Sequence, residues 1–544
     1  MIDKIKIFNF KTFQGLFELQ FNEGLNIIVG DNESGKSTII EAIHLGLSGW
    51  FAGRYISNQL NQYLFNYTSV KDYIDSISKG TPIEPPKIFI EFHFKDGMFP
   101  LFDGNQNSTG ENSSGFTFKV ELNSQYQAEY ELLLTSGSIK TLPIEYYHFY
   151  WESFARDERI TPRTIPIKSA LIDSSKSISS NGSDIYVNRI VKDFLDSKDV
   201  VDVSQAHRKM KELFMEEDSI KAINKKIQED SKITEKKVEL SVEFSSKNAW
   251  EHSLLTYLDK IPFSFLGNGE QCIIKTKLAL SHKKTEEANI IQIEEPENHL
   301  SHSKLNILIK DVLKSGDEKQ IIVSTHSSFV ANKLGLDNLL LLSSNKIIRL
   351  SELDPSTYNF FKKLAGYDTL RLILCKKAIL VEGDSDELVV QKAYSIANDG
   401  KLPIEDGIDV ISVGMSFLRF LEIAEKLDLE AVVVTDTDGK LEAIEKKYEN
   451  YIGENSKTKI KVCYDSEIDT GDLLVGEKPF NYNTLEPKLL KSNSLQKLNT
   501  VFGTTYESDD ELLKYMASNK TDCALAVFET TEDLTFPQYI LDAI

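Results

Sequence analysis

The chain has few cysteines, no apolar run long enough to cross a membrane and no excess of basic residues. Its four cysteines, Cys272, Cys375, Cys463 and Cys523, are scattered and form no CxxC pair, so neither a disulfide framework nor a zinc site is indicated. Leu339 to Leu342 is among the longest pure apolar stretches, which is far too short for a membrane span. The N-terminus lacks the continuous apolar region of a signal peptide. We therefore expect a cytoplasmic protein that does not associate with membranes.

The charge balance is acidic, with 62 Lys and Arg against 83 Asp and Glu and a net charge of -21. This balance argues against a protein that coats nucleic acid non-specifically, because phosphate binding requires a basic surface. It does not exclude a nucleic-acid enzyme, since metal-binding carboxylates add negative charge and a local basic groove can coexist with them. A chain of 544 residues is long enough for two or three domains.

The segment from Gly30 to Ser37, GDNESGKS, matches the phosphate-binding P-loop pattern GxxxxGK(S/T). It follows an apolar strand and precedes a helix expected from residue 37 to 47. In such a loop the backbone N–H groups surround the phosphates, the lysine reaches the β and γ phosphates, and the serine hydroxyl binds Mg²⁺. We therefore expect ATP with Mg²⁺ to bind through Gly30, Asn32, Gly35, Lys36, Ser37 and Thr38.

A second strand-like run, Ile290 to Ile293, ends in the adjacent carboxylates Glu294 and Glu295. In an ATPase, Glu294 would lie in the coordination shell of the Mg²⁺ ion, and Glu295 would orient the attacking water. His326 follows the next apolar run and is placed to contact the γ-phosphate end. Taken alone, His326 would more often be a structural histidine, but its position after both motifs favours a functional one.

The order of P-loop, Leu266-Gly267-Asn268-Gly269-Glu270-Gln271, acidic strand and histidine loop resembles the ABC-type ATPases, especially those of DNA repair. The resemblance implies a head-to-tail pair of subunits, in which Gly267 and Gly269 of one subunit close on the nucleotide bound by the other. Two positions depart from the family pattern. Gly267 stands where serine is usual, which puts one γ-phosphate contact in doubt and implies slow hydrolysis, and Glu294 replaces the more usual aspartate.

Two further acidic clusters each follow an apolar, strand-like run. Glu382 and Asp386 follow the first run, and Asp436 and Asp438 follow the second. If strand geometry persists, Asp436 and Asp438 point toward one site, while Asp386 lies one helical turn above Glu382. Converging carboxylates suit two divalent ions, Mg²⁺ or Mn²⁺, for phosphodiester chemistry. The alternative for each cluster alone is helix capping, but the presence of both favours a metal centre.

This second half resembles the Toprim domain, which has a strand-Glu-Gly start, a glycine turn (here Gly414) and a later DxD motif. An ABC-type ATPase fused to Toprim is similar to the OLD (overcoming lysogenization defect) family of nucleases. The resemblance implies two late members of the site: Glu486 as a further metal-binding carboxylate and Lys520 as the lysine that neutralises the phosphate. However, Pro487-Lys488 follows Glu486 where an acidic residue is often found, and an exposed lysine before a helix is the alternative for Lys520.

The expected fold class is α/β, with an ABC-type P-loop ATPase domain that contains a helical insertion and is followed by a C-terminal Toprim domain. The expected boundaries are 1–165 and 246–350 for the two ATPase parts, 166–245 for the insertion, 351–375 for a connector and 376–544 for Toprim. The insertion alternates Lys and Glu, which is typical of a solvated helical pair. The other interpretation is a dimerisation arm.

The leading functional hypothesis is a nucleotide-regulated, metal-dependent DNA endonuclease that nicks or cleaves. Within the OLD family the chain most resembles the GajA class of the Gabija anti-phage system, which implies a homo-oligomer, dimer or tetramer, and a separate UvrD-like helicase. The alternative is an ATP-driven DNA-binding sensor or repair-type ATPase with a non-cleaving Toprim domain. A topoisomerase or primase is disfavoured, because no tyrosine setting or zinc-ligand set of those enzymes is recognisable. Whether ATP activates or restrains cleavage is left open.

Overall fold

The computed structural model describes residues 1–31, 33–95, 97–135, 139–155, 159–173, 195–230, 238–242, 257–267, 269–271, 273–274, 277, 289–298, 300–314, 319–327, 330–331, 334–343, 345–363, 367–475 and 477–544. The chain divides into two compact units. The first unit comprises residues 1–10, 20–26 and 39–325, and the second comprises residues 11–19, 27–38 and 326–544. No helix among the described residues is both long enough and apolar enough to span a membrane.

An antiparallel sheet contains the N-terminal strand. Its order is β10-β9-β8-β6-β1-β2, and the strands are β1 (Ile2–Phe8), β2 (Leu16–Gln20), β6 (Ile88–Phe94), β8 (Ser113–Leu122), β9 (Tyr147–Ser153) and β10 (Arg159–Ile160), with β7 (Asp103–Gly104) paired to β8. The central strand β6 pairs antiparallel with both β1 and β8. Phe92 and Phe116 are buried and stack at a ring separation of 4.7 Å, so aromatic packing between β6 and β8 stabilises this layer.

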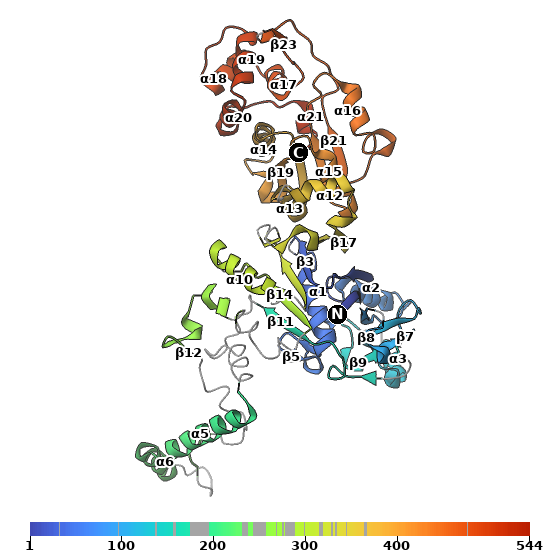
Figure 1. The fold of residues 1–544 in the computed structure, drawn as a ribbon, viewed down its shortest axis with the longest axis vertical. Helices are drawn as coiled ribbons and strands as arrows, with labels where there is room; N and C mark the ends of the chain where they lie inside the picture. The colour runs from blue at the N-terminus through green and yellow to red at the C-terminus, as the bar shows by residue number, and fades with distance from the viewer. Residues whose placement is uncertain are drawn as a thin grey trace. The chain divides into compact units, whose positions relative to one another are not determined.

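A second sheet contains the P-loop strand and has the order β11-β14-β15-β3-β16-β17 (Figure 1). Its strands are β3 (Leu25–Gly30), β11 (Ser169–Asp173), β14 (Ile290–Glu294), β15 (Gln320–Thr325), β16 (Leu339–Ser343) and β17 (Lys346–Arg349). The pairs β11–β14, β14–β15 and β3–β16 are parallel, and β17 is antiparallel to β16. Every residue of β14 and β15 is buried, which is why their sequences are apolar runs rather than alternating patterns.

Helices and short strands complete the N-terminal half. They are α1 (Lys36–Ser48), α2 (Tyr67–Ser78), α3 (Gln127–Thr135), α10 (His302–Lys314), and the two-residue strands β4 (Trp50–Phe51), β5 (Arg54–Tyr55), β12 (Tyr257–Leu258) and β13 (Ile261–Pro262). The helix predicted after the P-loop is therefore confirmed as α1. The strand-like run before Glu294 and the apolar run before His326 are confirmed as β14 and β15.

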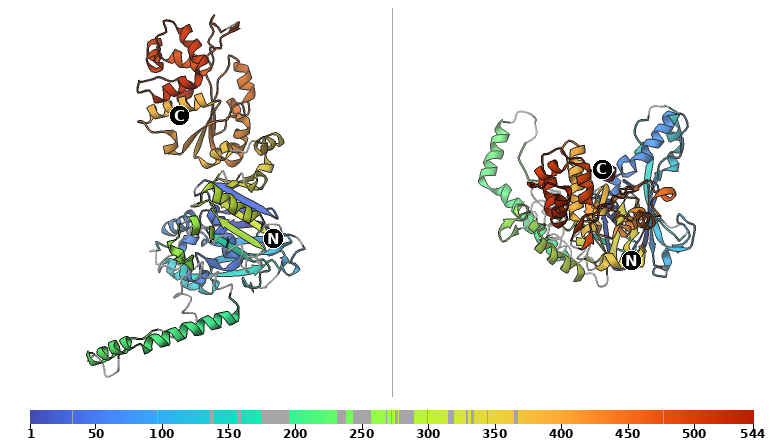
Figure 2. Two further views of the ribbon diagram at one scale, coloured as in Figure 1. Left: turned by 60° about the vertical axis from the view of Figure 1, so that its left-hand side comes forward. Right: turned by 90° about the horizontal axis from the view of Figure 1, so that it is seen from above.

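The charged insertion contains two helices, α5 (Ser197–Glu216) and α6 (Asp218–Asp230), which are drawn end to end in Figure 2. Asp196 begins α5 with a reciprocal capping box, since its carboxylate accepts the N–H of Asp199 while the Asp199 carboxylate accepts the N–H of Asp196. The predicted helical region is confirmed over these residues. The flanking segments 174–194 and 231–237 lie outside the described residues.

The C-terminal half begins with the helical connector α12 (Pro355–Lys363) and α13 (Tyr367–Leu374). A parallel sheet follows, with the order β19-β18-β20-β21. Its strands are β18 (Lys377–Val381), β19 (Ile408–Ser412), β20 (Glu430–Val434) and β21 (Ile460–Cys463), and its helices include α14 (Asp384–Ala397), α15 (Phe417–Leu427) and α16 (Leu441–Lys447). All three strand pairs are parallel, so the carboxyl ends of these strands share one edge.

Five more helices follow the sheet: α17 (Leu485–Ser492), α18 (Leu495–Phe502), α19 (Asp509–Ser518), α20 (Lys520–Glu529) and α21 (Gln538–Leu541), with the short strands β22 (Leu474–Val475) and β23 (Lys478–Pro479) before them. Figure 1 shows α17 to α20 gathered in one group, and α20 packs on α14. Ile379 and Val432 of the sheet share one hydrophobic core with Leu489, Val527 and Ile540 of these helices. The helical segment is therefore docked on the sheet, and its side chains can reach the carboxyl edge.

Candidate functional site

The P-loop between β3 and α1 has the backbone that a phosphate-binding loop requires. Gly35 has φ +105°, and a Cβ there would lie 2.8 Å from the Phe13 ring, so only glycine fits without displacing a neighbour. The Lys36 ammonium donates to the carbonyls of Gly30 and Asp31, both at 2.8 Å. The Thr38 hydroxyl accepts a hydrogen bond from the Thr12 hydroxyl at 3.0 Å. Asn32, one of the expected nucleotide contacts, lies outside the described residues.

The acidic strand end has an unusual backbone. Glu294 closes β14 and is 7% exposed, while Glu295 adopts a left-handed conformation with φ +43°. The Glu295 N–H donates to the Ser324 carbonyl at 2.9 Å, and its carboxylate accepts from the Asn298 amide at 3.0 Å. His326 follows β15 directly and is exposed. These positions are compatible with the predicted roles of the three residues, which stay predictions.

The glycine signature begins a helical turn. The Gly267 carbonyl accepts the N–H groups of Glu270 at 2.9 Å and Gln271 at 3.0 Å, and the turn includes Gly269. A helix start exposes unpaired N–H groups, which is what an anion-binding signature requires. The predicted contact of Gly267 and Gly269 with nucleotide in a second subunit remains a prediction.

Glu382, Asp436 and Asp438 all follow strands of the C-terminal parallel sheet. Glu382 comes directly after β18, and the two aspartates follow β20, its hydrogen-bonded neighbour. The predicted glycine turn is present at Gly414, which has φ +55° and donates its N–H to the Glu382 carbonyl at 3.1 Å. These three carboxylates therefore share one edge of the sheet, and we call them, together with Asp386 and Glu486, the acidic centre.

Asp386 has two roles at once. Its carboxylate accepts the Gly383 N–H at 3.0 Å, which is the capping interaction that the sequence offered as an alternative. Burial raises the pKa of Asp386 to about 6, and the neighbouring Glu382 and Glu486 carboxylates add to this rise, although the Gly383 hydrogen bond and Lys520 oppose it. A helix cap and membership of the acidic centre are therefore compatible.

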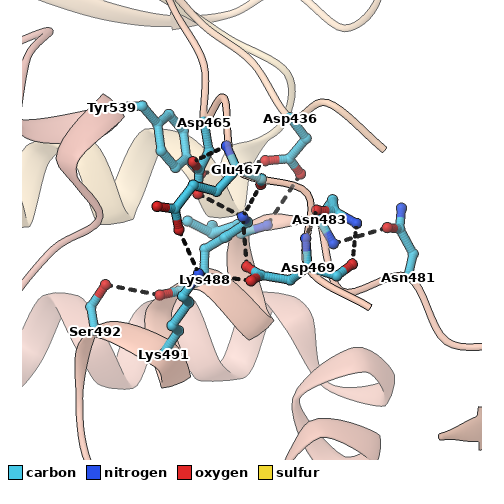
Figure 3. A network of polar contacts seen from close by, with 11 residues as sticks. Asp436, Asp465, Glu467, Asp469, Asn481, Asn483, Lys488, Lys491, Ser492 and Tyr539 are labelled. Carbon is cyan, nitrogen blue, oxygen red and sulfur yellow. Dashed lines mark hydrogen bonds and ion pairs between the residues drawn. The ribbon is translucent and has the colours of Figure 1, made fainter. Parts of the chain in front are cut away.

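Asp436 accepts hydrogen bonds from two uncharged donors. Its Oδ2 accepts the Leu485 N–H at 3.2 Å, and its Oδ1 accepts the Tyr539 hydroxyl at 3.4 Å (Figure 3). Burial, followed by repulsion from Asp386, Glu486 and Glu382, raises the pKa of Asp436 well above its usual range. Burial and Asp438 also raise the pKa of Glu382, while Lys447 and Lys520 lower it. The centre thus holds more negative charge than its surroundings neutralise.

The backbone at Asp438 differs from the strand geometry on which the sequence-based prediction depended. The strand ends at Val434, and Asp438 lies in a turn with φ +50°, so the strand alternation that would point it beside Asp436 does not persist. Its Oδ1 accepts the Asn481 amide at 2.7 Å. Asp438 still interacts electrostatically with Glu382. Asp436 and Asp438 therefore face different neighbours, because a turn rather than a strand connects them.

Glu486 and Lys520 meet, although they are far apart in sequence. Glu486 lies in the first turn of α17 and is 6% exposed, and the Lys520 ammonium at the start of α20 is 3.1 Å from its Oε1. Burial lowers the pKa of Lys520, but Glu486, Asp436 and Asp386 outweigh it and raise the pKa above its ordinary value. Lys520 is thus an exposed lysine that is ion-paired with Glu486, and its predicted role toward the phosphate stays a prediction.

Lys488, which the sequence indicated only as a departure from the family pattern after Glu486, also makes contacts in this region. Lys488 is 3% exposed, and its ammonium contacts Asp465 at 2.6 Å, Asp469 at 2.7 Å and the Glu467 carbonyl at 2.7 Å (Figure 3). We call this set of contacts the Lys488 lock. It holds the loop after β21 against α17. The acidic run that follows β21 was the available signal, because it is a third carboxylate-rich strand end beside β20.

Lys447 is a second residue that the sequence argument missed. It ends α16, and its ammonium lies 5.1 Å from the ring centroids of both Phe417 and Tyr448. Burial lowers the pKa of Lys447, and the Glu382 carboxylate opposes that change. The acidic centre therefore has one lysine on the side of Glu382 and another, Lys520, on the side of Glu486. No spacing rule in the sequence connects Lys447 with Glu382.

The acidic centre would suit a hard cation, since all five of its side chains offer carboxylate oxygens. The raised pKa values of Glu382, Asp386 and Asp436 also favour a cation, because a bound cation would stabilise their charged forms. However, among the described residues no group of three His, Cys, Asp or Glu side chains already forms a metal-binding set. The expected convergence of the carboxylates on one metal site is therefore incomplete among these residues.

The raised pKa of Asp386 predicts how metal-free protein responds to pH. Because the folded-state pKa, about 6, lies above the ordinary aspartate value of 3.8, folding favours the protonated form. The stabilising contribution is present at low pH and is lost as pH rises through about 6. In EDTA, the melting temperature of wild type minus that of Asp386→Asn should increase as the pH is lowered from 7.5 to 5. Parallel melting curves for the two proteins across this range would contradict the assignment.

Two family models match separate parts of the chain. Residues 4–300 match the AAA domain family, and residues 373–438 match the family described as overcoming lysogenization defect protein-like, TOPRIM domain. The predicted fold class, an ATPase domain followed by a C-terminal Toprim domain, is therefore confirmed. ATPase and Toprim domains both generally use Mg²⁺.

Curated relatives match only short segments. The DNA double-strand break repair Rad50 ATPase of Methanopyrus kandleri is 45% identical over 47 residues, which are 9% of this chain and 5% of that protein. The chromosome partition protein Smc of Desulfitobacterium hafniense is 28% identical over 100 residues, which are 18% of this chain and 8% of that protein. The chain thus spans less than a tenth of the length of either relative.

Solved structures of Smc heads are also similar at low identity. An Smc head bound to the C-terminal winged-helix domain of ScpA covers 64% of this chain and 97% of its own, with 16% identity and a TM-score of 0.33. A Pyrococcus furiosus Smc head domain with an extended coiled coil covers 67% and 99%, with 14% identity and a TM-score of 0.34. The match over residues 4–300 spans more than half of the chain, so the chain belongs to the AAA domain family, and residues 373–438 of the same chain match the OLD-like Toprim domain.

Proposed function

We propose that this protein is a metal-dependent DNA endonuclease whose cleavage activity is regulated by ATP. The observation that carries the proposal is the acidic centre itself. Carboxylates that follow β18 and β20 and lie on α14 and α17 raise one another's pKa at one sheet edge, and the Glu486 carboxylate contacts the ammonium of Lys520. Such a charge arrangement is unfavourable unless cations bind, and a phosphodiester is the substrate on which bound cations and a lysine act together.

Glu382, Asp386, Asp436, Asp438 and Glu486 are the residues that would hold the divalent ions. When bound, two such ions activate water and stabilise the leaving oxygen of the phosphodiester. Lys520, which is half exposed beside Glu486, would neutralise charge that develops on the phosphate. Lys447 would contribute positive potential from the side of Glu382. Leu485 and Tyr539 orient Asp436 without neutralising it.

The decisive experiment incubates the full-length protein with supercoiled DNA in Mg²⁺, Mn²⁺ or EDTA, with and without ATP. We expect nicking that requires metal and that falls by at least about 100-fold in Glu382→Ala, because losing a ligand costs more than losing an outer-shell partner. Glu442→Ala, at an exposed glutamate of α16, is the matched control and should cut like wild type. If wild type cuts in no condition, or Glu382→Ala cuts equally well, the nuclease proposal is wrong.

The same cleavage assay tests whether ATP bound at the P-loop regulates the nuclease. Lys36→Ala removes the ammonium that would reach the β and γ phosphates, so its cleavage should no longer respond to ATP. The direction in which ATP changes wild-type cleavage distinguishes activation from restraint. An unchanged ATP response in Lys36→Ala would show that this P-loop does not regulate the nuclease.

We further propose that the protein acts on DNA as a homo-oligomer, a dimer or tetramer, and takes part in anti-phage defence of the Gabija type with a separate UvrD-like helicase. The insertion supports self-association: Met210, Leu213 and Phe214 of α5 are 55%, 56% and 45% exposed. Exposed apolar residues of this kind favour the dimerisation arm over a purely solvated helical pair. Sedimentation of wild type against a variant with all three replaced by serine measures the contribution of α5.

A second candidate function is an ATP-driven DNA-binding sensor or repair-type ATPase with a non-cleaving Toprim domain. Two observations favour it: no preformed metal-binding set exists among the described residues, and segments of the chain match a Rad50 ATPase and an Smc protein. This candidate predicts ATP-dependent DNA binding in a fluorescence anisotropy assay, with intact DNA in every metal tested. Metal-dependent cutting that Glu382→Ala abolishes would exclude it.

A further inference from the structure

Two neutral donors hold Asp436, and this distinguishes it from Glu486 in the same centre. The Leu485 N–H lies 3.2 Å from Oδ2 and the Tyr539 hydroxyl lies 3.4 Å from Oδ1, whereas Glu486 is paired with the charged Lys520. A carboxylate has about four lone-pair positions, so one donor at each oxygen leaves positions for a cation. Because both donors are uncharged, they orient Asp436 without supplying a positive charge that would compete with a cation.

Tyr539 is fixed against the same strands that position Asp436. Its side chain, on α21, is 5% exposed, and the residues after α21 are tied to the sheet by two lysines. Lys377 of β18 donates to the Ala543 carbonyl at 3.0 Å, and Lys461 of β21 donates to the Asp542 carbonyl at 2.5 Å. β18 and β21 are the two neighbours of β20, the strand that leads to Asp436. The phenol therefore reaches Asp436 from a rigid frame.

We propose that Tyr539 is a positioning residue that holds Asp436 in the orientation in which a divalent cation binds. This inference rests on the proposed function, since the cation is the one that the nuclease would use. Outer-shell donors of this kind change metal affinity or activity by about 10- to 100-fold when they are removed. Tyr539 lies in the helical segment after residue 438, beyond the part of the chain that matches the Toprim family.

The test removes the Tyr539 hydroxyl. Tyr539→Phe keeps the buried ring and removes only the O–H, and Mn²⁺ affinity of the full-length protein is measured by calorimetry. We expect affinity to fall about tenfold, and kcat for nicking to fall while KM for DNA is unchanged. Tyr515→Phe is the control, because that ring packs on Phe502 and Tyr506 and makes no hydrogen bond to the acidic centre. Its Mn²⁺ affinity should match wild type.

A double-mutant cycle separates positioning from general destabilisation. If Tyr539 acts through Asp436, then Tyr539→Phe should not weaken Mn²⁺ binding further in an Asp436→Asn background. Unchanged Mn²⁺ affinity in Tyr539→Phe, equal losses in Tyr515→Phe, or additive losses in the cycle would overturn the inference. A wild type that binds Mn²⁺ but cuts no DNA would refute the nuclease function alone, whereas one that binds no Mn²⁺ would overturn both.

Discussion

Replacing Asp436 with asparagine is expected to abolish DNA cleavage and, in metal-free protein, to increase thermal stability. The first effect follows from the loss of a proposed metal ligand and should reach at least about 100-fold, above the cost of removing an outer-shell partner. The second follows from the raised pKa of Asp436, which burial and three neighbouring carboxylates cause. Folding disfavours the charged form of such a group, so at pH 7.5 a neutral amide removes a destabilising interaction. Nicking assays and melting curves in EDTA measure the two effects.

Asp469→Asn is the matched control, because its expected stability change has the opposite sign. Burial raises the pKa of Asp469, but hydrogen bonds from Lys488 and Lys491 outweigh this and lower it below its ordinary value. Folding therefore favours the charged form, and its contribution is present above the ordinary pKa and is lost as pH falls through the folded pKa. At pH 7.5, Asp469→Asn should lower the melting temperature. A lower melting temperature for Asp436→Asn in EDTA would contradict the view that the acidic centre is electrostatically strained.

Replacing Lys488 with methionine is expected to destabilise the C-terminal half by about 3 kcal/mol, the lower end of the range for breaking a buried ion pair. The lower end applies because Asp465 and Asp469 are 27% and 29% exposed and regain some hydration. The Lys488 lock connects the loop after β21 to α17, which carries Glu486, so its loss disturbs the acidic centre as well. The change in stability is measured by urea unfolding, monitored by far-UV circular dichroism. Retained ATP binding would show that the N-terminal half stays folded.

Lys491→Met provides the comparison for this second prediction. Lys491 contacts the same loop, at 2.7 Å from Asp469 and 3.0 Å from Glu467, but its side chain is 49% exposed. An exposed ion pair contributes only about 0–1 kcal/mol, so this variant should be close to wild type in stability. Equal destabilisation by both substitutions would show that burial of Lys488 is not what gives the lock its strength. Adding Asp465→Asn and Asp469→Asn to Lys488→Met should recover part of the lost stability.

Local patterns were sufficient for elements whose geometry is set by neighbours in sequence. The P-loop was recognisable because a glycine-rich loop between a strand and a helix has few alternatives, and Gly35 does have the positive φ that such a loop requires. Glu382 and Asp436 were predictable because parallel strands bring their carboxyl ends to one edge. The same rule was less accurate for Asp438, where a turn replaces the strand and the side chain meets Asn481.

The sequence by itself determined that an ATPase domain and a Toprim domain occur in this order, and that carboxylates follow two neighbouring strands. Hydrophobic runs, glycine loops and strand ends are short-range signals, and they survive without knowledge of the packing. Only the tertiary structure decided which distant residues complete the acidic centre. Lys520 meets Glu486, Tyr539 meets Asp436, and Lys488 meets Asp465 and Asp469 because the C-terminal helices share a core with the sheet. Packing of that core sets these contacts, and no spacing in the sequence encodes it.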